Sequence, residues 1–218
     1  SCMDIMGSFG LVVFGPWSVP KEATWVLGAQ GTFPTCTIGG WFTNSFIGSA
    51  WYSAMMSIYF LLVVRFECRD EWIARRVELP MHSISILLPV LGGTYAAIMG
   101  YMNPYFLHPG TCWVGSFPPL CGPNSRDDPA VECTRGQNAN KFHFFLGGGQ
   151  ISLCFVIIIV CMAFILARVR ATEIKMRGYL PEGASGILKQ TRQTSIQALY
   201  YIGAFFLCNS LNVAYKVA

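Results

Sequence analysis

The feature that most constrains the fold is an apolar run from Cys36 to Val64 that contains no Asp, Glu, Lys or Arg. A helix of this length is ~43 Å long at ~1.5 Å per residue, which exceeds the ~30 Å hydrocarbon core of a bilayer. The run therefore predicts a tilted membrane-spanning helix. Serines recur at every fourth residue and share one face of this helix; they are Ser45, Ser49, Ser53 and Ser57. Since small hydroxylic residues let helices approach closely, we expect the central helix of a bundle, the alternative being a single helix that faces lipid.

The composition indicates a polytopic membrane protein. Hydrophobic residues make up 53% of the 218 residues, and charged residues only 12%, about half the share usual in soluble domains. Four further segments are apolar enough to span a bilayer, at about 1–16, 80–102, 142–167 and 193–214. We therefore predict an all-α transmembrane bundle over residues 1–218, with an external cysteine-containing loop at 103–141. Because the chain starts without methionine inside an apolar run and ends beside the last helix, we expect a fragment that lacks helices at its ends.

The distribution of cations predicts the orientation of the bundle. Of the 15 Lys and Arg residues, ten lie in segments 65–79 and 168–192 and five lie elsewhere. The positive-inside rule therefore places these two segments in the cytoplasm. Anchoring to anionic membrane lipid explains most of these cations, and docking of a protein partner is the alternative. The net charge of +4 does not indicate a nucleic-acid partner, because the cations follow the membrane topology.

Cysteine placement agrees with this orientation. Cys36, Cys112, Cys121 and Cys133 fall on the side predicted to be external, where disulfides can form. Four cysteines allow three pairings, and the spacing does not choose among them. Cys68 falls on the internal side. The cysteines within the predicted helices are expected to be small apolar packing residues; they are Cys2, Cys154, Cys161 and Cys208.

Polar side chains inside the predicted helices are candidates for a buried polar path. Asp4 lies ~18 Å along a helix before Pro16, so its carboxylate is expected near mid-membrane. Burial of a carboxylate there costs free energy, so such groups usually belong to an ion site or to a polar network between helices. The alternative is an Asp near a helix end. Asn209 and Asn212 would face a cavity or another helix from the segment 193–214. Pro89 with Gly92-Gly93 predicts a kink in the helix 80–102.

Motifs for enzyme chemistry are missing from the sequence. The three histidines do not lie at metal-ligand spacing, and no zinc-protease, nucleophile-elbow or phosphate-loop motif occurs. We therefore predict that the chain is not an enzyme and uses no metal or cofactor.

Several of these residues together resemble a G-protein-coupled receptor. Cys36 stands at the outer end of a long helix, Asp4 in the helix before it, and Cys112-Trp113 in the next external loop, while the internal loops are basic. More narrowly, two segments look like the receptor-like proteins of diatoms and related algae, near the cyclic-AMP and secretin-like receptors. They are the run Gly31 to Phe66, which ends in Ser57 to Phe66, and the loop that contains Cys112-Trp113, Pro118-Pro119 and Cys121. The match covers helices two to six of seven, nearly the whole chain. It departs from rhodopsin-like receptors, since no Asp-Arg-Tyr ends the run 36–64 and no Cys-Trp-x-Pro lies in 193–214.

The resemblance implies a function and a set of site residues. It pairs Cys36 with Cys112, which leaves Cys121 with Cys133, and it implies a plasma-membrane protein that senses an unknown extracellular ligand and signals to a heterotrimeric G protein. The ligand-pocket candidates are Trp41, Asn44, Ser45, Trp113, Asn209 and Asn212. The intramembrane polar candidates are Asp4, Ser49 and Ser53. The G-protein contact candidates are Tyr59, Arg65, Phe66, Arg168, Arg170, Lys189 and Arg192.

The competing hypothesis is an ion or solute transporter or channel. Its polar path would use Asp4, the serine series, Asn209 and Asn212. It explains the external cysteines and the basic segment 168–192 less well, and no internal repeat of the kind found in many transporters is visible. A four-helix membrane organiser conflicts with five predicted spans.

Overall fold

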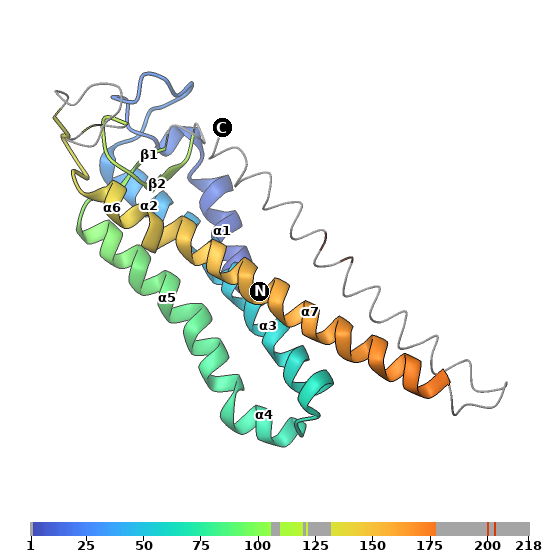
Figure 1. Ribbon diagram of the computed structural model, residues 1–218. Coiled ribbons are helices and arrows are strands. Elements are labelled where there is room, and N and C mark those ends of the chain that lie inside the picture. Colours follow the sequence, from blue (N-terminus) through green and yellow to red (C-terminus); the bar gives the residue numbers. More distant parts are fainter. Residues whose placement is uncertain are drawn as a thin grey trace. The chain divides into compact units, whose positions relative to one another are not determined.

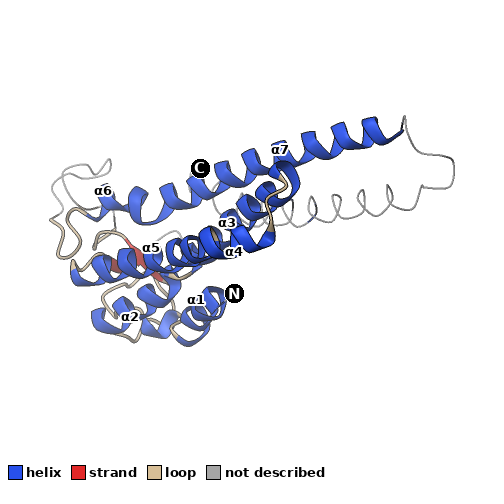
Figure 2. Cartoon of the chain, turned by 90° about the horizontal axis from the view of Figure 1, so that it is seen from below, coloured by secondary structure: helices blue, strands red, loops and turns tan. Residues whose placement is uncertain are grey.

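The computed structural model describes residues 2–105, 110–119, 121, 132–177, 200 and 203 (Figure 1). Over these residues the chain is mostly helical, with a short two-stranded sheet that the all-α prediction did not include (Figure 2). The predicted helix 193–214 lies outside the described residues, except for Tyr200 and Gly203.

The chain forms two compact units. The first contains Ser1–Tyr52 and Leu79–Cys154, and the second contains Ser53–Glu78 and Phe155–Ala218. Two long helices, α3 and α7, continue from the first unit into the second. Each unit is described by itself below.

Helix α1 (Cys2–Val13) is shorter than the predicted span 1–16. A 3-10 turn follows at Pro16–Ser18, because Pro16 has no N–H with which to continue the α-helix. The helix packs closely on α2, where a Cβ added to Gly10 would lie 2.8 Å from Cβ of Phe42. The ring of Phe42 stacks on Phe14, with 5.7 Å between centroids. Small residues on one helix and rings on the other therefore form this contact.

The central run forms two helices that meet at Ser45, where the prediction was one helix over 36–64. They are α2 (Phe33–Asn44) and α3 (Phe46–Phe66). The start at Phe33 follows from a capping box: Thr32 N–H donates to Thr35 Oγ1 at 2.8 Å, and Thr35 N–H donates to Thr32 Oγ1 at 3.5 Å. Ser45 keeps right-handed helical torsions, and its N–H donates to the carbonyls of Phe42 and Thr43. The helical turn at Ser45 is therefore tighter than an α-helical turn, and the chain does not reverse its direction between α2 and α3.

The next elements are α4 (Asp70–Arg76) and α5 (Glu78–Ile98). Helix α5 starts two residues before the predicted 80–102 and ends four residues earlier, with Pro89 inside it. Strands β1 (Met102–Pro104) and β2 (Cys112–Val114) then form an antiparallel hairpin in which Asn103 pairs with Trp113. The amide of Asn103 holds this hairpin, since its Nδ2 donates to the carbonyls of Gly100 and Gly115 at 3.0 and 2.7 Å.

The predicted helix 142–167 is longer and changes type along its length. It consists of α6 (Ala139–His143), the π-helix η2 (Phe144–Gly148) and α7 (Gly149–Arg177). Three stretches are long and apolar enough to cross a membrane: Phe33–Phe66, Glu78–Ile98 and Lys141–Thr172. The described part of the chain therefore has the composition and helix lengths of a multi-pass membrane protein.

Candidate functional site

Two disulfides hold a folded cap at one end of the first unit. We define the cap as residues 14–32, the β1–β2 hairpin and the described residues from 115 to 136. Cys36 in α2 bonds to Cys112 in β2, with 5.4 Å between their Cα atoms. Cys121 bonds to Cys133, with 5.2 Å between Cα atoms. These are the two pairs that the resemblance implied, and the first pins the hairpin to the start of the central run.

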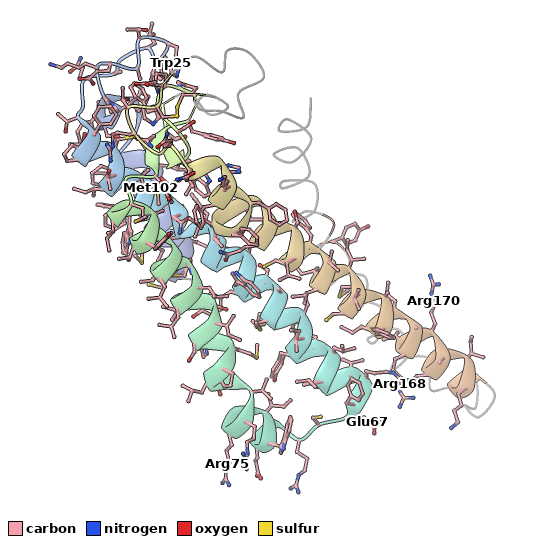
Figure 3. The ribbon with its side chains drawn as sticks, turned by 60° about the vertical axis from the view of Figure 1, so that its left-hand side comes forward. Trp25, Glu67, Arg75, Met102, Arg168 and Arg170 are labelled. Carbon is pink, nitrogen blue, oxygen red and sulfur yellow. A yellow bond between two sulfur atoms is a disulfide. The ribbon has the colours of Figure 1, made fainter. Side chains whose placement is uncertain are left out.

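Aromatic rings and one half-buried cation pack within the cap and against the start of α2. The Arg135 guanidinium lies over the ring of Phe33, 4.7 Å from its centroid, and burial lowers the pKa of Arg135. Phe117 packs against Phe33 and Trp25 at centroid distances of 5.2 and 5.8 Å, and Trp25 is labelled in Figure 3. Residues 134 and 135 also pair through their backbone N–H groups with the carbonyl of Phe117. The predicted external loop is thus an ordered structure at its described residues.

Beneath the cap, α2 and the first turns of α3 pack antiparallel on α5, in a contact that we call the seam. At one end Trp41 Nε1 donates to Thr94 Oγ1 at 3.1 Å. One turn along, Asn44 Nδ2 donates to the Pro89 carbonyl at 2.8 Å. At the other end Tyr52 Oη lies 3.2 Å from His82 Nδ1. Residue numbers rise along one helix as they fall along the other, so the polar contacts define the register of the two helices.

Two glycines allow this close approach. A Cβ at Gly93 would lie 2.9 Å from Asn44 Nδ2. A Cβ at Gly48 would lie 2.9 Å from the carbonyl oxygen of Ser85, a backbone atom that a side chain cannot push aside. The seam therefore depends on the absence of side chains at both positions.

The π-helix η2 is bound to α3 through one glutamine. Trp51 Nε1 donates to Gln150 Oε1 at 3.0 Å, and Gln150 Nε2 donates to the Phe145 carbonyl at 2.8 Å. Gln150 thus links the part of α3 that lies in the first unit to the π-helix η2, which precedes α7. Single π-turns of this kind often lie at functional sites.

Trp113 lies against η2 from the side of the hairpin. A Cβ at Gly147 would be 3.3 Å from Trp113 Nε1, and this buried N–H has no hydrogen-bond partner among the described residues. Nearby in the sequence, His143 stacks on Tyr105, with its Nε2 atom 3.4 Å from the Tyr105 hydroxyl. Burial raises the pKa of Tyr105, so its hydroxyl stays protonated at neutral pH.

In the second unit, one ion pair joins the end of α3 to α7. Arg168 Nη2 lies 2.7 Å from Glu67 Oε1, with 37% and 73% of the two side chains exposed (Figure 3). Glu67 has a φ of 53°, a left-handed conformation that ends the helix and that residues other than Gly, Asn and Asp adopt rarely. The structure therefore shows one of the predicted G-protein contacts, Arg168, with an acidic partner that the sequence analysis did not identify.

The structure places the other predicted site residues as follows. In the first unit, Trp41 and Asn44 meet α5, Ser45 is buried at the α2–α3 junction, and Asp4 and Ser49 are half-buried. In the second unit, Ser53 and Tyr59 are half-buried and Arg65, Phe66 and Arg170 are exposed. The remaining candidates lie outside the described residues: Lys189, Arg192, Asn209 and Asn212.

Several polar residues that join the helices were missed in the sequence. Thr94, Gln150 and Ser85 are single polar residues in apolar helices, and nothing in their spacing distinguishes them. The available signal was the proline: Ser85 stands four residues before Pro89, at the carbonyl that a helical proline leaves without its N–H. Gly93 was noted only as part of a predicted kink.

Comparison with family models, curated proteins and solved structures gives no match.

Proposed function

We propose that this chain is the transmembrane part of a receptor-like, multi-pass membrane protein of the plasma membrane. In this proposal an extracellular ligand binds at the cap and a heterotrimeric G protein binds at the opposite, cytoplasmic ends of the helices. The observation that carries the proposal is the Cys36–Cys112 disulfide. It ties the hairpin that carries Trp113 to the helical run that continues through α2 and α3.

The cap offers a plausible contact for a ligand. Trp113 has a buried N–H without a partner among the described residues, and it lies at the glycine-rich end of η2. A ligand with a hydrogen-bond acceptor would satisfy that N–H, and the gain would favour the state in which the acceptor and Trp113 meet. Transmission of the signal then requires different ligand affinities in two conformations of the bundle.

The second unit supplies the cationic surface for the G protein. Arg65, Phe66 and Arg170 are exposed, while Arg168 is held by Glu67. A G protein with an acidic contact segment would compete with Glu67 for Arg168. Anionic lipid remains the expected partner of the arginines that face the membrane surface.

Nucleotide exchange tests the proposal directly. Full-length protein in nanodiscs is mixed with the heterotrimeric G proteins of its own cell, and GTP uptake is measured with and without cell-derived ligand fractions. Stimulated uptake that is lost in Arg65→Glu supports the proposal. The proposal is wrong if no fraction and no G protein produces uptake above that of empty nanodiscs.

A transporter or channel is the second candidate, and one observation favours it: polar atoms of Asn44 and Ser85 are buried in the seam without partners among the described residues. Such atoms can line a polar path. Proteoliposomes that show ion or solute flux, reduced by Asn44→Leu, would support this candidate against the receptor.

A further inference from the structure

Several hydroxyl groups in the helices of this chain share one hydrogen-bonding pattern, and Ser85 does not have it. Five of them donate to the carbonyl four residues earlier, at 2.9–3.0 Å: Thr37, Thr43, Ser57, Ser152 and Thr172. Ser85 Oγ is completely buried and has no hydrogen-bond partner among the described residues. Its hydroxyl therefore lacks the local bond that satisfies the others.

Asn44 leaves a second unpaired atom on the facing helix. Its side chain is 2% exposed, and its Nδ2 donates to the Pro89 carbonyl at 2.8 Å. A carbonyl accepts and does not donate, so the amide orientation is determined and Oδ1 points elsewhere. Asn44 Oδ1 is buried without a partner among the described residues.

Pro89 creates a third hydrogen-bonding position on α5. It has no N–H, so the carbonyl of Ser85, four residues earlier, loses its usual helical donor. That carbonyl faces Gly48, where a Cβ would lie 2.9 Å away. A hydroxyl, an amide oxygen and a carbonyl are thus all in the same part of the seam.

The register of the seam sets the spacing of these groups. Asn44 lies opposite Pro89 and Gly93, while Gly48, one turn further, lies opposite Ser85. One helical turn is ~5.4 Å. Two O–H···O hydrogen bonds of ~2.8 Å each, bent at the near-tetrahedral angle of a water oxygen, span ~4.5 Å, a little less than one turn. One water molecule therefore matches the separation of the two levels once the Asn44 side chain covers part of it.

We propose that an ordered water molecule is bound in the seam between Asn44 and Ser85. The water donates to Asn44 Oδ1 and to the Ser85 carbonyl and accepts from the Ser85 hydroxyl. Three hydrogen bonds are the usual number for a buried water in a protein. The chemistry favours water over a metal cation, because the position offers only three neutral oxygen groups, whereas a hard cation such as Ca²⁺ takes about 6–8 oxygen ligands, carboxylates among them. The water donates to the Ser85 carbonyl in place of the N–H that Pro89 lacks. Helix α5 therefore has a hydrogen bond beside its proline whose donor can exchange with other water molecules.

Methionine oxidation by synchrotron radiolysis tests the proposal in the full-length protein in nanodiscs. Radicals formed from a bound water oxidise the side chains beside it, even where bulk solvent does not reach. Met3 is 3% exposed, and its Cε would lie 2.6 Å from a Cβ on Gly48. Met102 is the internal control, because it is also completely buried but lies at the cap end of the seam, against Gly40.

We expect Met3 to be oxidised faster than Met102 in the unmodified protein. Ser85→Ala should lower the Met3 rate, and Ser85→Ala with Asn44→Leu should reduce it to that of Met102. Ser152→Ala is the matched control and should leave the Met3 rate unchanged, since its hydroxyl has a local carbonyl partner. Equal Met3 and Met102 rates in the unmodified protein would refute the bound water without the need for any variant.

A cation in place of water is the other outcome that overturns the proposal. Sodium and potassium are replaced by N-methylglucamine at constant ionic strength, and the Met3 rate is measured again. An unchanged rate supports water. A rate that changes, and returns when sodium is restored, shows that the seam binds a cation instead.

Discussion

The two units of the chain differ in the kind of interaction that holds them. The first unit has two disulfides, a half-buried cation over an aromatic ring, and a seam of hydrogen bonds between α2–α3 and α5. In the described part of the second unit, one cross-helix polar contact is the exposed pair Glu67–Arg168. Buried and covalent contacts resist exchange, whereas an exposed ion pair is easily replaced by another partner.

This difference agrees with a division of labour between the units. A ligand is recognised best by a preorganised surface, as in the cap, because little conformational entropy is then lost on binding. A signalling partner needs groups that can change their contacts, as Arg168 and its neighbours can. The predictions below test whether the contrast in stability is as large as the contacts indicate.

The largest effect is expected from the disulfide that joins Cys36 to Cys112. It closes a chain segment with a sequence separation of 76 residues, and loop entropy gives about 4.5 kcal/mol for a loop of that size. Cys36→Ser with Cys112→Ser should therefore destabilise the protein by several kcal/mol in equilibrium unfolding in mixed micelles. Replacement of the second pair, with a separation of 12 residues, should cost about 3 kcal/mol. A larger loss from the second pair would contradict the central place of the first.

The next effect concerns close packing in the seam. Gly48→Ala places a methyl group against the Ser85 carbonyl and Met3, within 3.0 Å of each, and overpacking of this kind costs about 1–3 kcal/mol. Gly92→Ala is the matched control, because its new Cβ would meet Leu146 Cδ2 at 3.4 Å, and it should be neutral or slightly stabilising. The two free energies of unfolding are compared in the same micelles. Equal free energies of unfolding for the two variants would mean that the helices of the seam lie further apart than the structure shows.

A single hydrogen bond should have a smaller effect. Trp51→Phe removes the donor to Gln150, and we expect a loss of about 1 kcal/mol. Gln150→Leu removes the other partner, and the double variant should lose less than the sum of the two. An additive result in this double-mutant cycle would show that Trp51 and Gln150 do not interact.

The smallest effect is expected for Glu67→Gln in the second unit. The pair with Arg168 is exposed, so its removal should cost less than about 1 kcal/mol, and this cost should fall further as salt is raised. The unfolding free energy is measured at low and high ionic strength. Arg170→Gln is the control, since Arg170 is an exposed arginine of the same helix. A loss as large as that of the cysteine variants would remove the distinction between the two units.

The long helices were largely predictable from the sequence. The uncharged run at 36–64, the run at 80–102 and the run at 142–167 all correspond to apolar helices, since only apolar helices of this length satisfy every backbone group inside a membrane. Their ends differ for local reasons. Thr32 and Thr35 start α2 at Phe33, and the apolar run gave no sign of this cap.

The first helix and the hairpin show the limits of hydropathy. The segment 1–16 is apolar, but its helix has only 12 residues because Pro16 and the turn after it end it. Strands β1 and β2 are three residues each, too short to leave a periodic pattern. They form because a disulfide and the amide of Asn103 hold them together.

The sequence by itself determined the mostly helical fold, the apolar helices long enough to span a membrane and the four cysteines of the two disulfides, because these depend on composition and on local periodicity. Only the tertiary structure decided which residues of different helices meet. Asn44 with Pro89, Gly48 with Ser85, and Glu67 with Arg168 are 45, 37 and 101 positions apart along the chain. Their pairing depends on helix register and close packing, which are properties of two helices together and leave no mark in the sequence of either one.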